Sequence, residues 1–339
     1  MKKIFLIVLL CGLFLTGCGK KGEKEVLGEF KNTVDNVKSY YIEGQMELVN
    51  NEDIYTYNIY VSYQADDYYK IELINTINDH QQIILRNKDG VYVVTPSLNK
   101  SFKFQSDWPY NNSQVYLLSS LLDDISNDND RKFSSLDDGY MFETKVNFPN
   151  NPKLISQKVY FGNDNLPNKV EVFDTDGNVE IKMTFNKIDI SKSFDSNYFE
   201  LNSILDTDNL EVPDEETEDN KTKESATIND IIYPMYLPAN TYLTNQEKVS
   251  TEDGERLILT FTGDSSFTIV EEPVIVSKSP EIIPTYGDLE LIGGSIAVIN
   301  ETSANWFSNG IEYYIASDTM KTSELLEVAK SISVLPVGK

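Results

Sequence analysis

Apolar and polar residues alternate through most of residues 41–104 and again through residues 140–190. Alternation with a period of two places every second side chain on one face of a β-strand, so these stretches predict strands that bury one face. The expected strands are 41–49, 54–63, 68–74, 82–86, 91–95, 101–104, 140–148, 155–161, 167–173 and 179–190. Turn signals between them, such as Asn50-Asn51 and the run from Asp174 to Asn178, predict antiparallel hairpins.

Two stretches in this part of the chain have the spacing of amphipathic helices instead. Apolar residues recur every three or four positions over 25–39 and over 113–125. This spacing puts them on one face of a helix, which we expect to pack against the sheet. Ser113 stands where an N-cap residue would begin the second helix.

An acidic stretch divides the chain. Residues 206–224 hold nine acidic side chains and almost nothing apolar, so they predict a self-repelling linker over 204–224. It separates a domain over 25–203 from a smaller one over 225–339. In the second region we expect strands at 256–262, 266–270, 288–291, 295–300, 304–308 and 311–317. A helix over 324–333, capped by Thr322 or Ser323, completes a small α+β domain.

The N-terminus has the features of a secretion signal. Lys2 and Lys3 precede an apolar run over 4–15, and Leu15-Thr16-Gly17-Cys18 follows. This pattern resembles bacterial lipoprotein precursors. The resemblance implies that residues 1–17 are removed, that Cys18 is diacylated, and that 18–24 tether the protein to the outer face of a membrane. The alternative, a transmembrane anchor, needs about 20 apolar residues, more than this run offers.

The overall composition excludes several classes of function. The net charge of −25 disfavours nucleic acid, because phosphate binding requires clustered Lys and Arg. The only cysteines are Cys11, inside the signal, and Cys18, so neither a disulfide nor a thiolate metal site is expected.

The sequence offers little for catalysis or metal binding. His80 is the only histidine and lies in a polar turn, so no histidine pair is available for a zinc site. A Ser-His-Asp arrangement would have to use His80, but the sequence has no nucleophile elbow. The run from Asp174 to Asn178 begins like a calcium loop but has Phe185 where a bidentate Glu would stand, which favours a hairpin turn. Asp128 and Asp130 are interpreted as part of a solvated loop. We expect no enzyme activity, no metal and no cofactor.

Two parts of the sequence resemble known lipoproteins. Residues 95–109, 112–118 and 120–125 are similar to LolA-related lipoproteins of spore-forming Firmicutes, which include GerS. The wider order of elements resembles the lipoprotein-carrier superfamily of LolA and RseB. Tyr236-Leu237-Pro238, Trp306, Gly310, Tyr313, Tyr314 and the 324–332 helix resemble a module of unknown function found in such lipoproteins and in some anti-sigma proteins.

The resemblance implies a mainly β fold with α: a half-open antiparallel β-barrel enclosing helices. In the carriers the concave face takes acyl chains. The residues that would line such a pocket here are Ile42, Met46, Ile59, Val61, Ile71, Leu73, Ile83, Leu85, Val91 and Val93. The same alternation is typical of a filled core, and the sequence leaves both readings open.

Another candidate site is an edge for a protein partner. Its residues are Lys100, Phe102, Phe104 and Trp108. The alternative is that these aromatic residues pack over the barrel mouth, and nothing in the sequence decides between the two.

The resulting hypothesis is a membrane-anchored, non-enzymatic lipoprotein that serves as a protein-docking or lipid-binding scaffold in sporulation or germination. The resemblance suggests a cell-wall amidase as partner. A lipid or lipoprotein carrier, and an envelope-stress sensor acting on an anti-sigma factor, remain alternatives. A homodimer formed by strand exchange also stays open.

Overall fold

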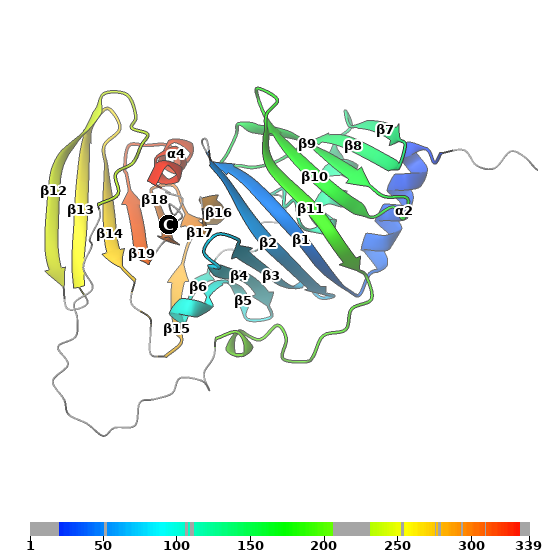
Figure 1. The fold of residues 1–339 in the computed structure, drawn as a ribbon, viewed down its shortest axis with the longest axis horizontal. Coiled ribbons are helices and arrows are strands. Elements are labelled where there is room, and N and C mark those ends of the chain that lie inside the picture. Colours follow the sequence, from blue (N-terminus) through cyan, green and yellow to red (C-terminus); the bar gives the residue numbers. More distant parts are fainter. Residues whose placement is uncertain are drawn as a thin grey trace, which may run out of the picture.

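A computed structural model describes residues 20–50, 53–105, 108, 112–205, 231–251, 254–274, 276, 279–292, 294–308 and 310–332. Cys18, the signal segment and most of the acidic linker lie outside these ranges. The described chain is mainly β with few helices, as expected (Figure 1). No helix in the described ranges is long and apolar enough to cross a membrane.

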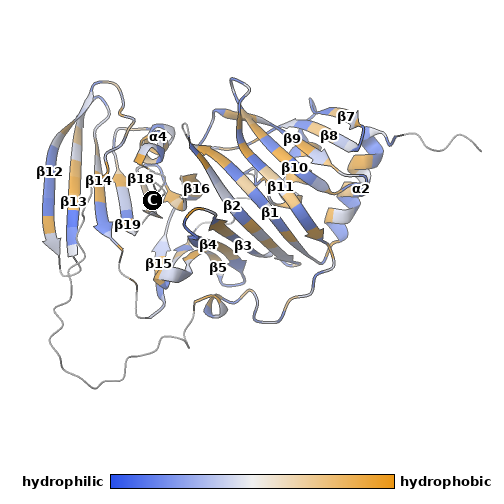
Figure 2. Ribbon diagram, viewed as in Figure 1, coloured by the Kyte–Doolittle hydropathy of each residue, from blue (hydrophilic) through white to orange (hydrophobic). Residues whose placement is uncertain are grey.

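Twelve strands form the larger sheet, in the order β15-β6-β5-β4-β3-β2-β1-β11-β10-β9-β8-β7. Its strands are β1 (Ser39–Asn50), β2 (Asp53–Gln64), β3 (Tyr68–Asn75), β4 (Gln81–Asn87), β5 (Gly90–Thr95), β6 (Lys100–Phe104), β7 (Lys132–Leu136), β8 (Gly139–Lys145), β9 (Leu154–Phe161), β10 (Pro167–Asp174), β11 (Val179–Asp189) and β15 (Glu281–Thr285). Sequence neighbours pair mostly as antiparallel hairpins, and apolar and polar positions alternate along β1, β2 and β9–β11 (Figure 2).

The larger sheet is open, with β15 and β7 as its two edges. The half-open barrel expected from the resemblance is therefore not confirmed. The predicted hairpin at Asp174 is present: the carboxylate of Asp174 accepts hydrogen bonds from the backbone N–H of Asp176 (2.9 Å) and of Asn178 (2.8 Å). These bonds hold the turn between β10 and β11.

Helices α2 (Glu23–Asn36) and α3 (Leu118–Asn127) contribute their buried residues to the same apolar core as one face of this sheet. Phe30 of α2, for example, lies edge-on to Phe161 of β9, with ring centroids 5.0 Å apart. The expected start of the second helix at Ser113 is wrong. Ser113 bonds to Asp124 and to the backbone of Asn147 instead, and these bonds hold residues 112–117 in an irregular turn.

The opposite face of β4 and β5 is also covered. Ile83 and Leu85 point to that face and form a separate cluster with Phe199 and Leu205, which follow β11. The prediction that these two residues lie on the concave face is therefore wrong. Ile84 takes that place, since it pairs with Ile71 of β3 in the same core.

The smaller sheet has seven strands in the order β12-β13-β14-β19-β18-β17-β16. They are β12 (Thr241–Thr251), β13 (Gly254–Gly263), β14 (Phe267–Pro273), β16 (Asp288–Ile292), β17 (Ser295–Ile299), β18 (Ser303–Ser308) and β19 (Ile311–Ala316). Helix α4 (Thr322–Ile332) packs its apolar face on this sheet. Strand β12 forms the outer edge and is exposed along nearly its whole length (Figure 1).

Strand β15 connects the two parts of the molecule. It follows β14 in the chain, yet it pairs in parallel with β6 of the larger sheet, from Glu281 opposite Lys100 to Thr285 opposite Phe104. The C-terminal region, defined here as residues 231–332, therefore adds an edge strand to the sheet of the N-terminal region, residues 20–205.

Candidate functional site

The candidate site is a cavity of about 140 Å³ between the two regions. One wall comes from β1, β3, β4 and the turn before α3, and the other from β16, β17 and α4. Its apolar lining consists of Met46, Leu48, Val49, Leu73, Ile84, Trp108, Val115, Phe148, Leu154, Ile181, Leu289, Leu291 and Ile296. The volume is close to that of an engineered cavity that holds one benzene molecule.

Only two residues of the predicted lipid pocket, Met46 and Leu73, line this cavity. The other predicted residues on the same face are packed in the core: Ile42, Ile59, Val61, Ile71, Val91 and Val93. The helices and aromatic side chains therefore fill much of the concave face. The remaining space lies where the C-terminal region covers the sheet.

Trp108 closes one side of the cavity. Its ring stacks on Tyr69 with centroids 5.3 Å apart and an interplanar angle of 6°, and the Arg86 guanidinium lies 5.7 Å from the Trp108 ring. Trp108 is buried, so it forms part of the wall and is not a surface anchor.

Three acidic or basic side chains line the same cavity: Glu180 of β11, Glu290 of β16 and Lys330 of α4. Burial raises the pKa of the Glu290 carboxyl, and burial also raises the pKa of Glu180. For Lys330, burial lowers the ammonium pKa, and the nearby carboxylates of Glu290, Glu327 and Glu180 oppose that effect. No sequence pattern predicts this group, because its members come from three distant segments.

The predicted partner edge is occupied within the chain. Lys100 forms an ion pair with Glu281 of β15 (3.7 Å), and Phe102 stacks on Phe307 of β18 with centroids 5.6 Å apart. Phe104 is buried, opposite Thr285 of β15. In this structure these residues dock the C-terminal region, and their edge is not open to another protein.

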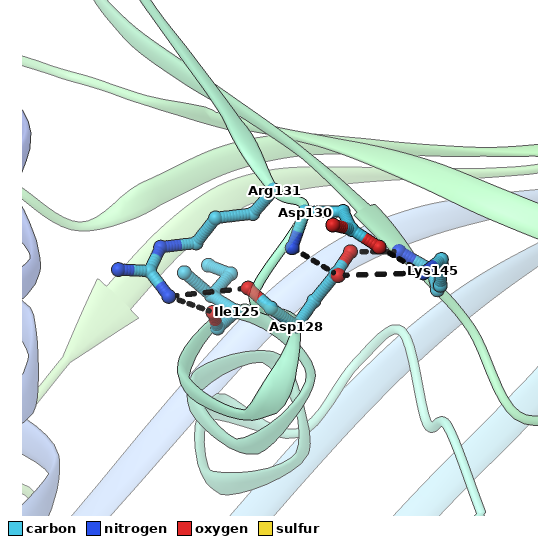
Figure 3. Close-up of polar contacts among 5 residues, drawn as sticks. All are labelled: Ile125, Asp128, Asp130, Arg131 and Lys145. Atoms are coloured by element: carbon cyan, nitrogen blue, oxygen red, sulfur yellow. Dashed lines mark hydrogen bonds and ion pairs between the residues drawn. The ribbon is translucent and has the colours of Figure 1, made fainter.

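A second hollow lies beside the C-terminal end of α3 and is lined by acidic and amide side chains. Figure 3 shows how its charges are satisfied: Asp128 accepts hydrogen bonds from the backbone N–H of Asp130 (2.9 Å) and Lys145 (2.8 Å), and the Lys145 ammonium lies 2.6 Å from Asp130. Arg131 donates to the carbonyls of Ile125 and Asp128. These bonds are typical of a structured turn.

The structure shows no cluster of metal ligands within the described ranges. Among the described residues no group of three or more His, Cys, Asp and Glu side chains is placed to hold a metal ion. His80 stands at the turn between β3 and β4, where burial lowers its pKa.

Comparison with known proteins decides the family. The family described as "Sporulation protein YdcC-like" matches residues 1–199. Sporulation protein YdcC of Bacillus subtilis (strain 168) is 33% identical over 336 residues, which cover 98% of this chain and 97% of that protein. The chain belongs to the YdcC-like sporulation protein family. The resemblance to sporulation proteins is thus confirmed at the family level.

Solved structures similar to this YdcC-like protein are more distant. The Pseudomonas aeruginosa MucA/MucB complex matches at 11% identity and a TM-score of 0.34, covering 89% of this chain and 97% of that chain. A LolA superfamily protein from Nitrosomonas europaea matches at 9% identity and a TM-score of 0.30, covering 53% of this chain and 98% of that chain. The Clostridioides difficile complex of the CwlD amidase with the GerS lipoprotein matches at 16% identity and a TM-score of 0.20, covering 53% of this chain and 99% of that chain.

Proposed function

We propose that this YdcC-like protein is an extracytoplasmic, non-enzymatic binding protein of sporulation, anchored to the membrane through Cys18. Its cavity takes an acyl chain, and the C-terminal region covers that chain. The observation that carries the proposal is the apolar cavity left between the larger sheet and the C-terminal region, in a core that is otherwise filled. Apolar pockets with a few convergent polar groups are typical ligand sites.

Burial of an acyl chain has a clear physical basis. Each CH₂ group moved from water into an apolar site contributes about 0.8 kcal/mol. A cavity of about 140 Å³ accommodates a short segment of one chain, so a longer ligand requires the C-terminal region to shift. The covering elements β16 and α4 belong to that region, which makes it the lid of the site.

Native mass spectrometry with organic extraction tests this function. The chain without residues 1–18, which keeps every described residue, should carry lipid after purification. Leu291→Trp should abolish retention, because Leu291 lines the cavity and the larger indole fills it. Leu243→Trp is the matched control, since Leu243 lies on the outer strand β12 far from the cavity. A lipid-free wild-type chain would reject the proposal.

A second candidate function is protein docking by the C-terminal region. Met235 and Tyr242 are 89% and 65% exposed, and no charged residue occurs between Ile231 and Gln246. Exposed apolar surface of this kind often marks an interaction site. The resemblance to GerS lies in residues 95–125 of the N-terminal region, and it makes a cell-wall amidase the first partner to try with the whole chain. Co-elution of the two purified proteins, lost with Tyr242→Ala, would support this role.

A further inference from the structure

We infer that the cavity selects an amphiphile with a primary amine in its headgroup, such as phosphatidylethanolamine, over an anionic lipid of the same chain length. This inference rests on the proposed acyl-chain site and names the chemistry of the ligand. The observation behind it is the group formed by Glu180, Glu290 and Lys330 in a lining that is otherwise mainly apolar. Such charged groups are costly to bury unless they are paired or serve a function.

Each of the three side chains is placed by a different element. Glu180 lies at the start of β11, Glu290 in the middle of β16, and Lys330 in the last turns of α4. All three are partly buried. The chain therefore brings two carboxyl groups and one ammonium group to one apolar wall, at the boundary between the two regions.

Neighbouring charges do not remove the excess of carboxylates. Lys153 is paired with Glu327 at 2.9 Å, and the two residues act on Glu180 with opposite signs, so this pair adds no net charge. Asn150 donates a hydrogen bond to Glu290, and Asp288 of β16 adds a further negative charge beside it. The lining itself holds two acidic groups and one basic group.

A zwitterionic amine headgroup complements this arrangement. Its ammonium group donates hydrogen bonds to Glu180 and Glu290, while its phosphate accepts from Lys330. A headgroup of phosphatidylglycerol has no cation. Its hydroxyl groups donate hydrogen bonds without the Coulomb attraction of an ammonium, and its phosphate is repelled by the two carboxylates. A quaternary ammonium, as in phosphatidylcholine, carries the charge but has no N–H to donate.

Binding of soluble short-chain lipids tests the inference. Dihexanoyl phosphatidylethanolamine, phosphatidylcholine and phosphatidylglycerol are titrated separately into the chain without residues 1–18. Trp108 lines the cavity, so its fluorescence reports occupancy. Phosphatidylethanolamine should bind about tenfold more tightly than phosphatidylglycerol, as expected for one charge-assisted hydrogen bond of about 1.5 kcal/mol. The affinity for phosphatidylcholine should lie between the affinities for these two lipids.

Variants separate a recognition role from a structural one. Glu290→Gln should bring the ratio of the two dissociation constants close to one, and Glu247→Gln on exposed β12 should leave it unchanged. A loss of protein stability lowers the folded fraction and weakens the apparent affinity for both lipids by the same factor. The ratio of the two dissociation constants therefore stays the same. Lys330→Met should weaken the binding of both lipids, with phosphatidylethanolamine still bound more tightly than phosphatidylglycerol.

The outcomes distinguish this inference from the proposed function. If phosphatidylglycerol binds as tightly as phosphatidylethanolamine, or if Glu290→Gln keeps the wild-type ratio, the headgroup inference is overturned while the acyl-chain site stands. If no lipid binds and none is retained on purification, the proposed function itself fails.

Discussion

The side-chain amide of Gln82 bonds to both backbone groups of Ile296, 214 positions further along the chain. Its Oε1 accepts from the Ile296 N–H, and its Nε2 donates to the Ile296 carbonyl at 3.5 Å. Gln82 is buried on β4, and Ile296 is buried on β17 beside the cavity. One side chain thus joins the N-terminal sheet to the C-terminal region.

Gln82→Ala should loosen this junction. The substitution leaves two buried backbone groups of Ile296 without a partner, which costs about 1–3 kcal/mol of unfolding free energy. Urea unfolding measures the change in the global free energy of unfolding. Hydrogen exchange at the Ile296 amide reports how far the substitution opens this junction locally. Gln45→Ala, at an exposed position of β1, should change neither quantity.

The ring pair across the junction should be energetically coupled. Phe102 and Phe307 stack 5.6 Å apart, and such aromatic pairs contribute about 0.5–1.5 kcal/mol beyond the area they bury. A double-mutant cycle of Phe102→Ala and Phe307→Ala should show that coupling. The same cycle for Phe102 and Phe267, which lie in different core clusters, should show additive effects. Additivity for the first pair would argue against docking through these rings.

Glu271 should make the stability of the C-terminal region depend on pH. It is fully buried on β14, and burial raises the pKa of its carboxyl to about 7. A carboxyl whose folded pKa lies above its unfolded value stabilises the protein when protonated, so this contribution is lost as pH rises from about 4.5 to about 7. Glu271→Gln should flatten that part of the stability curve in urea unfolding at pH 5 and pH 8. Glu247→Gln serves as the exposed control.

Cys18→Ala should release the protein from membranes, because the acyl chains attached to that thiol are the expected anchor. Fractionation of cells that carry the full chain provides the measurement. Cys11→Ala, inside the apolar signal run, should leave the protein in the membrane fraction. Continued membrane binding of the Cys18 variant would contradict the lipoprotein prediction.

Much of the larger sheet could be predicted from sequence because its strands alternate between a core face and a water face. β2, for instance, spans Asp53–Gln64 where the alternation predicts 54–63. The same reasoning misplaced Ile83 and Leu85, since β4 is buried on both faces and a continuous apolar run carries no alternation. β12 was not predicted either, because it is exposed on both faces and so shows no alternation of apolar and polar residues.

The candidate site was harder to predict than the fold. Strand β15 has the sequence Glu-Ile-Ile-Pro-Thr, and its partner β6 lies about 180 positions earlier, so no local pattern links the two. Glu290 and Lys330 read as ordinary residues of a strand and a helix. Their meeting with Glu180 depends on how the two regions dock, which period and spacing along one segment do not reveal.

The parallel pairing of β15 with β6 also bears on how the chain matures. Strand β6 is complete once residue 104 has emerged, but its partner is made only after a further 175 or so residues. Until then the nascent sheet presents unpaired backbone groups next to Phe102, an arrangement that favours aggregation. A chain that stops before residue 281 keeps that edge unpaired, so the C-terminal region completes the N-terminal sheet beside β6 as well as covering its cavity.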